Sequence, residues 1–272
     1  MNAIEPRPIP DTLTFLRLAV DMRQLYKVAR ERGWGKRGRT DHFDEGRALH
    51  HALTETFGEK ALPLFRLLVA PGKVKGALYA YSTLPEKQLR QTAELCAHEY
   101  DEALGIKDMR AKAFPTRFAA GARLGFDLRV RPVRRTKSAQ NKSGVREIDA
   151  FLHEALQHEN DPAFMANTGR TRERVYTDWL SERFAGAAAL EADGNGIATT
   201  ALARFNRGVA VRRNAESSNR GSEGPDAVIH GTLVVADKTA FAALLANGIG
   251  RHKAYGYGML LLRPPTPRRQ EG

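Results

Sequence analysis

Two adjacent histidines, His50 and His51, have side chains that suit proton transfer near neutral pH. They fall in a segment whose spacing predicts a helix, with Leu49, Leu53 and Phe57 on its buried side. Successive residues of a helix are rotated by about 100°, so the two histidines cannot share a role. His50 lies about 90° from the centre of the buried side, at its rim, and His51 is expected to point into solvent.

A histidine at the rim of an apolar face can serve chemistry or packing. In RNA cleavage by attack of a 2′-hydroxyl, such a group can accept the hydroxyl proton or protonate the leaving 5′-oxygen. Arg47, one turn earlier, could stabilise the charge on the pentacoordinate phosphorus. The pattern alone nevertheless favours a half-buried structural side chain at His50.

A glycine-rich loop, residues 248–258, lies between a predicted helix and an apolar strand and holds four glycines in eleven residues. Backbone amides of such a loop, near Gly250, can meet phosphate oxygens, and Arg251 and Lys253 add positive charge. The loop is neither a P-loop nor a dinucleotide fingerprint, because no helix follows it. The alternative is a packed turn in which the glycines let the loop cross a helix.

Positive charge is concentrated in one segment of the chain. The formal net charge is +12 with a pI near 10. Between Arg110 and Arg146 there are eleven basic residues and one acid, Asp127, so this segment carries +10 of that charge. A polyanionic partner is therefore favoured over general solubility as the explanation.

Within this segment an arginine ladder follows a strand that alternates between apolar and charged residues over 124–130. Side chains on one face of a strand recur at roughly 6–7 Å, which is close to the phosphate spacing along RNA. We expect this face to be open and to bind RNA; a solvated sheet face is the alternative. The predicted binding residues of the ladder are Arg129, Arg131, Arg134, Arg135 and Lys137.

The elements that would position these residues follow the order β-α-β-β-α-β twice. In the first half we expect strands at 12–20, 64–70, 76–83 and 109–115, a loop insert over 22–43, and helices between Asp44 and Gly58 and between Pro85 and Gly105. In the second half we expect strands at 124–130, 187–192, 197–206, 227–235 and 258–262, a loop at 137–144, and helices at 149–158, 172–184 and from Asp237 to Gly248.

This order predicts an α+β fold of two tandem ferredoxin-like domains with antiparallel sheets, which is also the arrangement of RNA-recognition modules. The first domain, residues 1–115, would carry the histidine helix. The second, residues 116–272, would carry the arginine-rich strand and the glycine-rich loop.

Other features narrow the class of protein. No apolar run approaches the roughly 20 residues that span a bilayer, and residues 1–10 lack the apolar core of a signal peptide. The single Cys96 cannot form an internal disulfide, so we expect a cytoplasmic protein without a membrane partner. Neither the eight histidines nor Cys96 have a metal-ligand spacing, and no metal or cofactor is expected.

Three segments carry a resemblance to a known family. They are residues 247–262, with the strand 231–237 and the helix that precede them; residues 126–136; and the spacing of His50, Leu53 and Phe57. With these segments the sequence resembles the CasE-type CRISPR repeat endoribonucleases of type I-E systems.

The resemblance implies a metal-independent nuclease that cuts at the base of the repeat hairpin, with His50 as the catalytic histidine. It also implies a 2′,3′-cyclic phosphate product and a complex with other Cascade subunits, especially a backbone subunit, in which the processed RNA stays bound. Family members carry a tyrosine three residues before that histidine, where this chain has Arg47.

Three hypotheses follow for the function. The first is a repeat endoribonuclease in which His50 acts as general acid or base and Arg47 assists. The second is a non-catalytic subunit that binds the RNA hairpin. The third is a basic protein that holds a nucleotide-type substrate in the glycine-rich loop.

Overall fold

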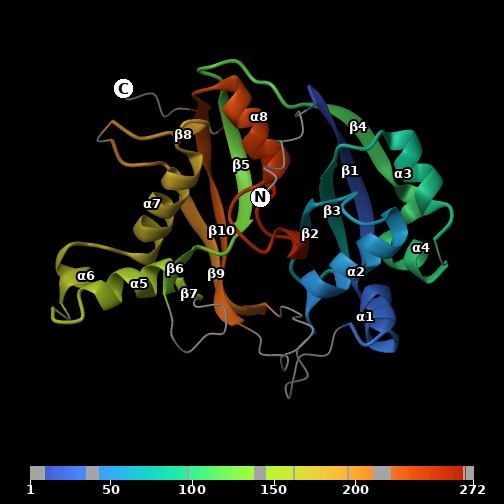
Figure 1. The fold of residues 1–272 in the computed structure, drawn as a ribbon, viewed down its shortest axis with the longest axis horizontal. Helices are drawn as coiled ribbons and strands as arrows, with labels where there is room; N and C mark the ends of the chain where they lie inside the picture. The colour runs from blue at the N-terminus through green and yellow to red at the C-terminus, as the bar shows by residue number, and fades with distance from the viewer. Residues whose placement is uncertain are drawn as a thin grey trace, which may run out of the picture.

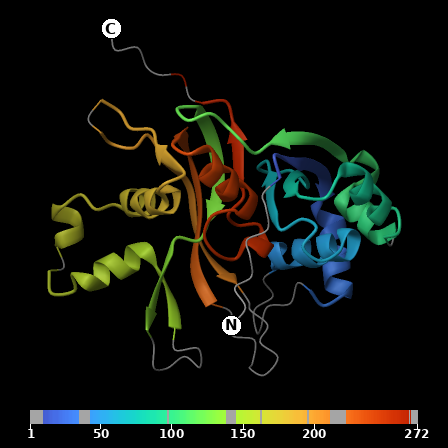
Figure 2. The same ribbon diagram turned by 45° about the horizontal axis from the view of Figure 1, so that its top comes forward.

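The computed structural model describes residues 10–34, 43–96, 98–137, 145–161, 163–194, 196–210, 222–265 and 267. The chain forms two halves that lie side by side, each a β-sheet with helices packed against it (Figure 1, Figure 2). In both views the segment around residues 253–255 lies at the border between the halves, next to the helix that carries His50 and His51.

The first half has a four-stranded sheet in the order β2-β3-β1-β4, and all neighbouring strands are antiparallel. This is the ferredoxin-like arrangement that the sequence predicts. Its elements are β1 (Thr12–Asp21), α1 (Met22–Glu31), α2 (Glu45–Phe57), β2 (Leu64–Val69), β3 (Lys75–Ser82), α3 (Glu86–Ala93), α4 (His98–Leu104), the 3-10 turn η1 (Ile106–Asp108) and β4 (Arg110–Pro115).

The boundaries of α2 follow from its capping residues. Asp44 Oδ1 accepts a hydrogen bond from the backbone N–H of Arg47 at 3.1 Å, and Gly58 ends the helix with a φ of +91°. Leu49 and Leu53 are buried on one side of α2 and belong to the same hydrophobic core as Leu18 of β1. This packing fixes the direction in which each histidine of the helix points.

Two elements of the first half differ from the prediction. Residues 22–31 form a helix instead of a loop, because Asp21 caps the first turn and the buried Leu25, Val28 and Ala29 have helical spacing. Residues 35–42 of the same predicted loop lie outside the described residues. The predicted continuous helix before Gly105 is two helices, α3 and α4, although no glycine or proline lies within 86–104.

The second half repeats the same order with additions. Its elements are β5 (Arg123–Val130), β6 (Val133–Lys137), β7 (Val145–Asp149), α5 (Ala150–Gln157), α6 (Phe164–Asn167), α7 (Arg172–Phe184), β8 (Ala188–Leu190), β9 (Ala201–Ala210), β10 (Ser222–Val235), α8 (Lys238–Asn247), the 3-10 turn η2 (Lys253–Tyr255) and β11 (Leu260–Arg263). The sheet order β11-β5-β10-β8 is again ferredoxin-like, so the predicted tandem fold is confirmed.

The additions to the second half are where the prediction was incomplete. β6 and β7 form a separate two-stranded hairpin, where we expected only a loop after the arginine-rich strand. β9 pairs with β10 beside β8, and both β9 and β10 extend further toward 211–221 than expected. Residues 138–144, the centre of the expected loop, lie outside the described residues.

The described residues form two hydrophobic cores. The first contains only residues of the first half, whereas the second also takes in Leu13, Leu64 and Tyr81 of the first sheet. The second core therefore extends across the border between the halves. The predicted division at residues 115 and 116 falls in the connection between β4 and β5, and the assignment of two domains stays a prediction.

Polar contacts also join the halves. Arg66 Nε of β2 donates to Asp127 Oδ1 of β5 at 2.8 Å, with side chains only 7% and 13% exposed. His230 Nε2 lies 2.7 Å from the other oxygen of the same carboxylate. Within the described part of the chain, no helix is long and apolar enough to cross a membrane.

Candidate functional site

The glycine-rich loop, residues 248–258, packs against α2 and β2 of the first half. A Cβ on Gly46 would lie 2.6 Å from the backbone oxygen of Tyr255, and one on Gly256 would lie 2.8 Å from Phe65. Both distances are too short for a side chain, so these glycines permit the close approach. These glycines thus serve the packed turn that was the alternative to phosphate binding, and the packing partner is the first half of the chain.

His50 lines a small cavity between α2, the start of β2 and the glycine-rich loop. The cavity has a volume of about 140 Å³. The His50 ring lies 5.4 Å from the Tyr255 ring in an edge-on arrangement. The lining residues are His50, Leu53, Thr54, Gly58, Lys60, Leu62, Pro63, Phe65 and Ala254.

Burial of the His50 imidazole lowers its pKa, and the nearby Glu59 carboxylate opposes this effect only in part. Neutral imidazole is therefore the main form near neutral pH. A neutral ring nitrogen can accept a proton, which a general base at this position requires.

His51 occupies a different environment from the one we expected. Its ring stacks on Trp34 at 5.2 Å, and Trp34 is only 8% exposed. The prediction that His51 points into solvent was wrong, because the segment after α1 covers this side of α2. The two histidines still have separate surroundings, as the helical rotation requires.

Three residues add polar groups near His50: Arg47 lies one turn earlier on α2, Lys60 lines the cavity, and Tyr255 contacts the imidazole ring. Arg47 is half-buried on the same helix, and its side chain forms no ion pair among the described residues. Lys60 lines the His50 cavity and has a φ of +60°, which is uncommon for a non-glycine residue. Neither Lys60 nor Tyr255 was among the predicted site residues; only the position of Tyr255 inside the glycine-rich motif could have indicated it.

The predicted arginine ladder is divided between two strands. Arg129 lies in β5 and Arg131 just after it, whereas Arg134, Arg135 and Lys137 lie in β6, which belongs to the separate hairpin. A single ladder of evenly spaced charges is therefore not formed.

The face that carries Arg129 and Arg131 is not open. Arg129 donates to both carboxylate oxygens of Asp226 at 2.9 and 2.6 Å and lies 3.6 Å from Glu45 of α2. Arg131 is 2% exposed and donates to the backbone oxygen of Gly208. The expectation of an open strand face was wrong, because the first half and neighbouring strands cover it.

A cationic cavity of about 360 Å³ lies between β6, α7 and the glycine-rich loop. Four of the predicted binding residues line it, together with Arg183, which lies over the Trp179 ring at 5.0 Å. Glu182 pairs with Arg134 at 2.6 Å, so part of the charge is neutralised. The full lining is Val133, Arg134, Arg135, His153, Trp179, Arg183, Gly250 and Arg251.

Glu147 of β7 anchors the glycine-rich loop beside this cavity. Its carboxylate accepts a hydrogen bond from Arg251 and lies 2.9 Å from His252 Nε2. These contacts, the His252 hydrogen bond first, lower the pKa of Glu147 to about 2. The residues near Gly250 and Arg251 are thereby fixed to the β6–β7 hairpin.

The two remaining predicted residues lie outside both cavities. Lys253 Nζ donates to the backbone oxygen of Asn247 at 2.7 Å, and burial lowers the pKa of this amine. Lys137 is exposed at the end of β6. Both can add positive charge near the loop and the hairpin without lining a cavity.

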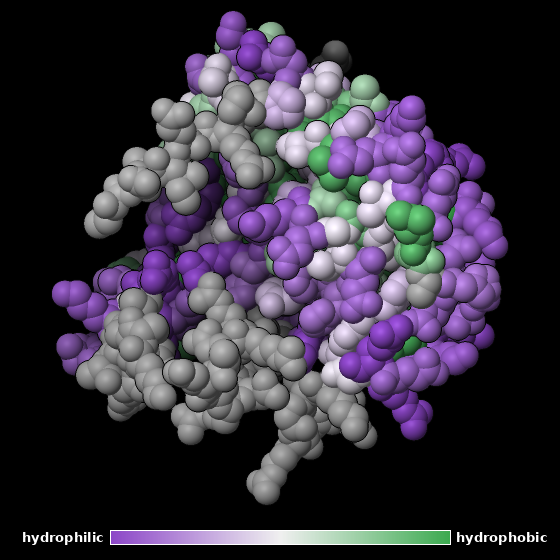
Figure 3. Space-filling model, turned by 45° about the vertical axis from the view of Figure 1, so that its right-hand side comes forward, coloured by the Kyte–Doolittle hydropathy of each residue, from purple (hydrophilic) through white to green (hydrophobic). Residues whose placement is uncertain are grey.

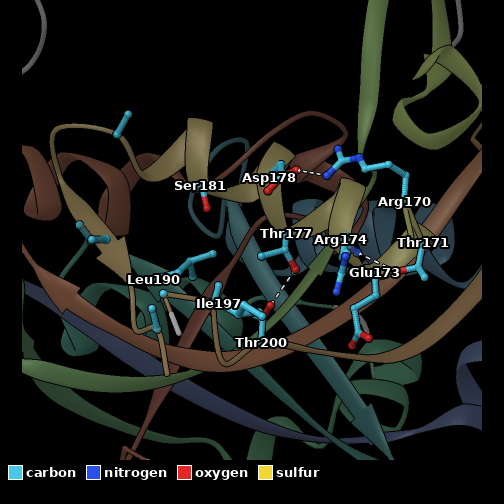
Figure 4. A pocket seen from close by; sticks show the side chains of 16 residues that line it. Arg170, Thr171, Glu173, Arg174, Thr177, Asp178, Ser181, Leu190, Ile197 and Thr200 are labelled. Atoms are coloured by element: carbon cyan, nitrogen blue, oxygen red, sulfur yellow. Dashed lines mark hydrogen bonds and ion pairs between the residues drawn. The ribbon is translucent and has the colours of Figure 1, made fainter. Parts of the chain in front are cut away.

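A larger cavity of about 950 Å³ lies between α7 and the connection from β8 to β9 (Figure 4). A hydrogen bond of 2.7 Å between the hydroxyls of Thr177 and Thr200 joins its two sides. It contains none of the predicted site residues. Among the described residues, no group of three or more His, Cys, Asp or Glu side chains is placed to hold a metal ion.

The fold and these cavities define a class: a tandem ferredoxin-like protein whose glycine-rich loop borders both a histidine cavity and a cationic cavity. Residues 15–264 match the family model described as CRISPR associated protein. This match spans most of the chain, so the chain belongs to that family.

Solved structures share the fold. One is Thermus thermophilus Cse3 bound to an RNA representing a pre-cleavage complex, with a TM-score of 0.60, 18% identity, and coverage of 93% of this chain and 100% of that one. A structure of the CRISPR endoribonuclease Cse3 bound to 19 nt RNA gives the same values. A chain of a CRISPR RNA-guided surveillance complex, pre-nicking, has a TM-score of 0.51 and 18% identity over 92% of this chain and 99% of that one. No curated protein sequence matches the chain.

Proposed function

We propose that this protein is a metal-independent endoribonuclease that binds the CRISPR repeat hairpin and cuts precursor CRISPR RNA at the hairpin base. One observation carries the proposal: the glycine-rich loop lines the cationic cavity with Gly250 and Arg251 and the His50 cavity with Ala254. An RNA backbone held in the first cavity can therefore reach the histidine along a single loop. The Cse3 structures with bound RNA support this reading.

The residues at hand suit attack by a 2′-hydroxyl. Neutral His50 takes the hydroxyl proton while the 2′-oxygen bonds to phosphorus and the bond from phosphorus to the 5′-oxygen breaks. Lys60 and Arg47 stabilise the negative charge on the phosphorane, and Lys60 can protonate the leaving 5′-oxygen. The products are a 2′,3′-cyclic phosphate and a 5′-hydroxyl.

Among the predicted binding residues, we expect Arg134, Arg135, Lys137 and Arg251 to contact phosphates; Arg134 and Arg251 would do so while sharing their charge with Glu182 and Glu147. Arg129 and Arg131 are largely buried as well as paired, and they act by holding the halves and strands in position. After cleavage the hairpin product stays bound, and the protein joins other subunits of a Cascade complex, a backbone subunit among them. The structural similarity to a chain of a surveillance complex supports this assembly, which would operate in the cytoplasm.

The alternative is a subunit that binds the hairpin without cutting it, and Arg47 is the observation that favours it. A guanidinium is a poor proton donor or acceptor at neutral pH, so this position cannot supply the acid–base chemistry of a tyrosine.

The test is to incubate the protein in EDTA with the repeat hairpin RNA from its own genomic neighbourhood. A matched RNA carries a single 2′-deoxy nucleotide at the cut position. We expect cleavage of the first RNA to a 2′,3′-cyclic phosphate and none of the second. Binding of both RNAs without cutting would support the alternative, and an absence of binding would exclude both functions.

A further inference from the structure

One face of the first sheet carries an aromatic pair that the proposed cleavage site does not use. Leu16 and Leu18 of β1 point toward the helices, so Phe15 and Arg17 point to the opposite face. On that face the Phe15 ring lies parallel to the Tyr79 ring of β3, with a centroid distance of 5.5 Å and planes 8° apart. β1 and β3 are the two central strands of the sheet.

The second half covers only part of this face. Leu13 and Tyr81 are buried, and the Tyr81 hydroxyl donates to the backbone oxygen of Leu260 in β11. Phe15 and Tyr79, further along the same strands, pack at the edge of the second core and are only half-buried. The aromatic pair therefore lies where the contact with the second half ends.

Three cations border the aromatic pair. In the strand register Lys112 lies opposite Phe15, and Arg110 lies opposite Arg17. Lys112 Nζ is 5.7 Å from the centre of the Phe15 ring. Arg110 and Lys112 are exposed, and Arg17 is half-buried.

In the part of the chain that the structure describes, no carboxylate lies within ion-pair distance of Arg17, Arg110 or Lys112. Arg66 on the same sheet provides the contrast, because Asp127 neutralises its charge. The uncompensated charge makes this region complementary to a polyanion.

We propose that Phe15 and Tyr79, with Arg17, Arg110 and Lys112, form a binding site for single-stranded RNA that flanks the hairpin. Aromatic side chains on the central strands of a four-stranded ferredoxin-like sheet are placed to stack on unpaired bases, and neighbouring cations contact the phosphates. Paired bases cannot stack in this way, so the site selects single strands over the hairpin stem. This inference rests on the proposed function, since it assigns the part of the RNA that lies outside the hairpin.

The experiment compares the affinity for the hairpin RNA alone with that for the same hairpin carrying a 5′ or a 3′ tail of about eight adenosines, a length within the usual range of single-strand sites. We expect one tail to raise the affinity of the wild type by about tenfold or more. A Phe15→Leu/Tyr79→Leu variant, which keeps apolar volume but loses the rings, should lose that gain and keep its affinity for the tailless hairpin. Tyr26→Leu is the matched control, because Tyr26 is an exposed aromatic residue on α1 and should leave the gain unchanged.

A second measurement covers the case in which the double variant does not fold. Tails with 4-thiouridine are crosslinked to the wild type, and we expect the labelled peptides to come from β1, β3 or β4. Crosslinks confined to other elements, or a wild type that binds the hairpin but gains nothing from either tail, would overturn the inference. If the Phe15→Leu/Tyr79→Leu variant kept the gain in affinity from the tail but no longer assembled with other subunits, this face of the first sheet would bind a protein instead of RNA. If the hairpin itself is not bound, the proposed function fails, and binding of a free oligoadenosine then decides the inference separately.

Discussion

His50 is the residue on which the chemistry depends, and its environment sets the pH at which it can act. Burial lowers the pKa of its imidazole below the ordinary value of about 6.5. A general base must be unprotonated, so cleavage is lost as the pH falls through that lowered pKa.

We therefore predict that the second-order rate constant for cleavage rises with pH to a plateau, with a midpoint below about 6.5. This rate constant is measured across pH 4.5–8 in single-turnover reactions, with the enzyme in excess over the RNA but below saturation. A rate that instead falls as the pH rises through the midpoint would assign the general acid to His50 and the base to another group.

Two arginines of the predicted ladder are expected to behave differently, although both were predicted to bind RNA. Arg135 is exposed beside the cationic cavity, so Arg135→Gln should weaken hairpin binding several-fold and reduce the salt dependence of binding by about one phosphate contact. Arg129→Gln removes the partner of Asp226 and should lower the midpoint of thermal unfolding. Salt titrations of binding and thermal melts of both variants test this pair. Equal effects of the two variants on binding and stability would contradict the division of roles.

At the scale of elements, the contact between α2 and the glycine-rich loop holds His50 in its place. An alanine is normally better than glycine within a helix, by about 1 kcal/mol. At Gly46, however, a Cβ would lie 2.6 Å from the backbone oxygen of Tyr255.

Gly46→Ala should therefore displace the loop from α2 and slow cleavage by on the order of tenfold or more, since misplacement of reacting groups by about 1 Å is costly. Hairpin binding should change little, because the loop lines the cationic cavity with Gly250 and Arg251, whereas Gly46 contacts Tyr255. Gly72→Ala is the control for a general loss of stability, because its φ of +72° strains an alanine although a Cβ would meet nothing within 4 Å. Unchanged cleavage in Gly46→Ala would show that the loop contact does not position His50.

For the whole molecule, the Arg66–Asp127 pair joins the halves across their border. Asp127→Asn would leave the Arg66 guanidinium buried without its counter-charge, and we expect it to reduce the free energy of unfolding by about 3 kcal/mol. Asp11→Asn, which breaks the exposed pair with Arg117, should cost less than about 0.5 kcal/mol. Urea denaturation of the two variants measures both values. If both variants lost a similarly small free energy of unfolding, the buried Arg66–Asp127 pair would contribute little to the contact between the halves.

Much of this architecture could be predicted from the sequence because its signals are local. Asp44 and Gly58 bound α2, and the order of strands and helices identifies the tandem ferredoxin-like fold. His50 was placed at the rim of an apolar face by helical spacing alone, and it lines a cavity there.

What could not be predicted depends on contacts between distant segments. The alternation in β5 locates the charged face correctly, yet only the tertiary fold shows that Glu45 and Arg66 cover it. The same holds for His51, which Trp34 covers, and for Tyr255, which reaches His50 from the far end of the chain. The face shown in Figure 3 is mostly hydrophilic, with hydrophobic residues in small groups, so the hydropathy of that face does not point to a site either.

In the proposed mechanism His50 moves the proton, and a comparison of His50→Gln with His51→Gln tests this role. Both variants replace a histidine on α2, but only His50 lines the cavity beside the glycine-rich loop. The measurement is the single-turnover rate of hairpin cleavage in EDTA, together with the Kd for the same RNA. We predict that His50→Gln loses at least about a hundredfold in rate with a Kd close to that of the wild type, whereas His51→Gln cuts within a few-fold of the wild type. Cleavage by His50→Gln at the wild-type rate would contradict the account.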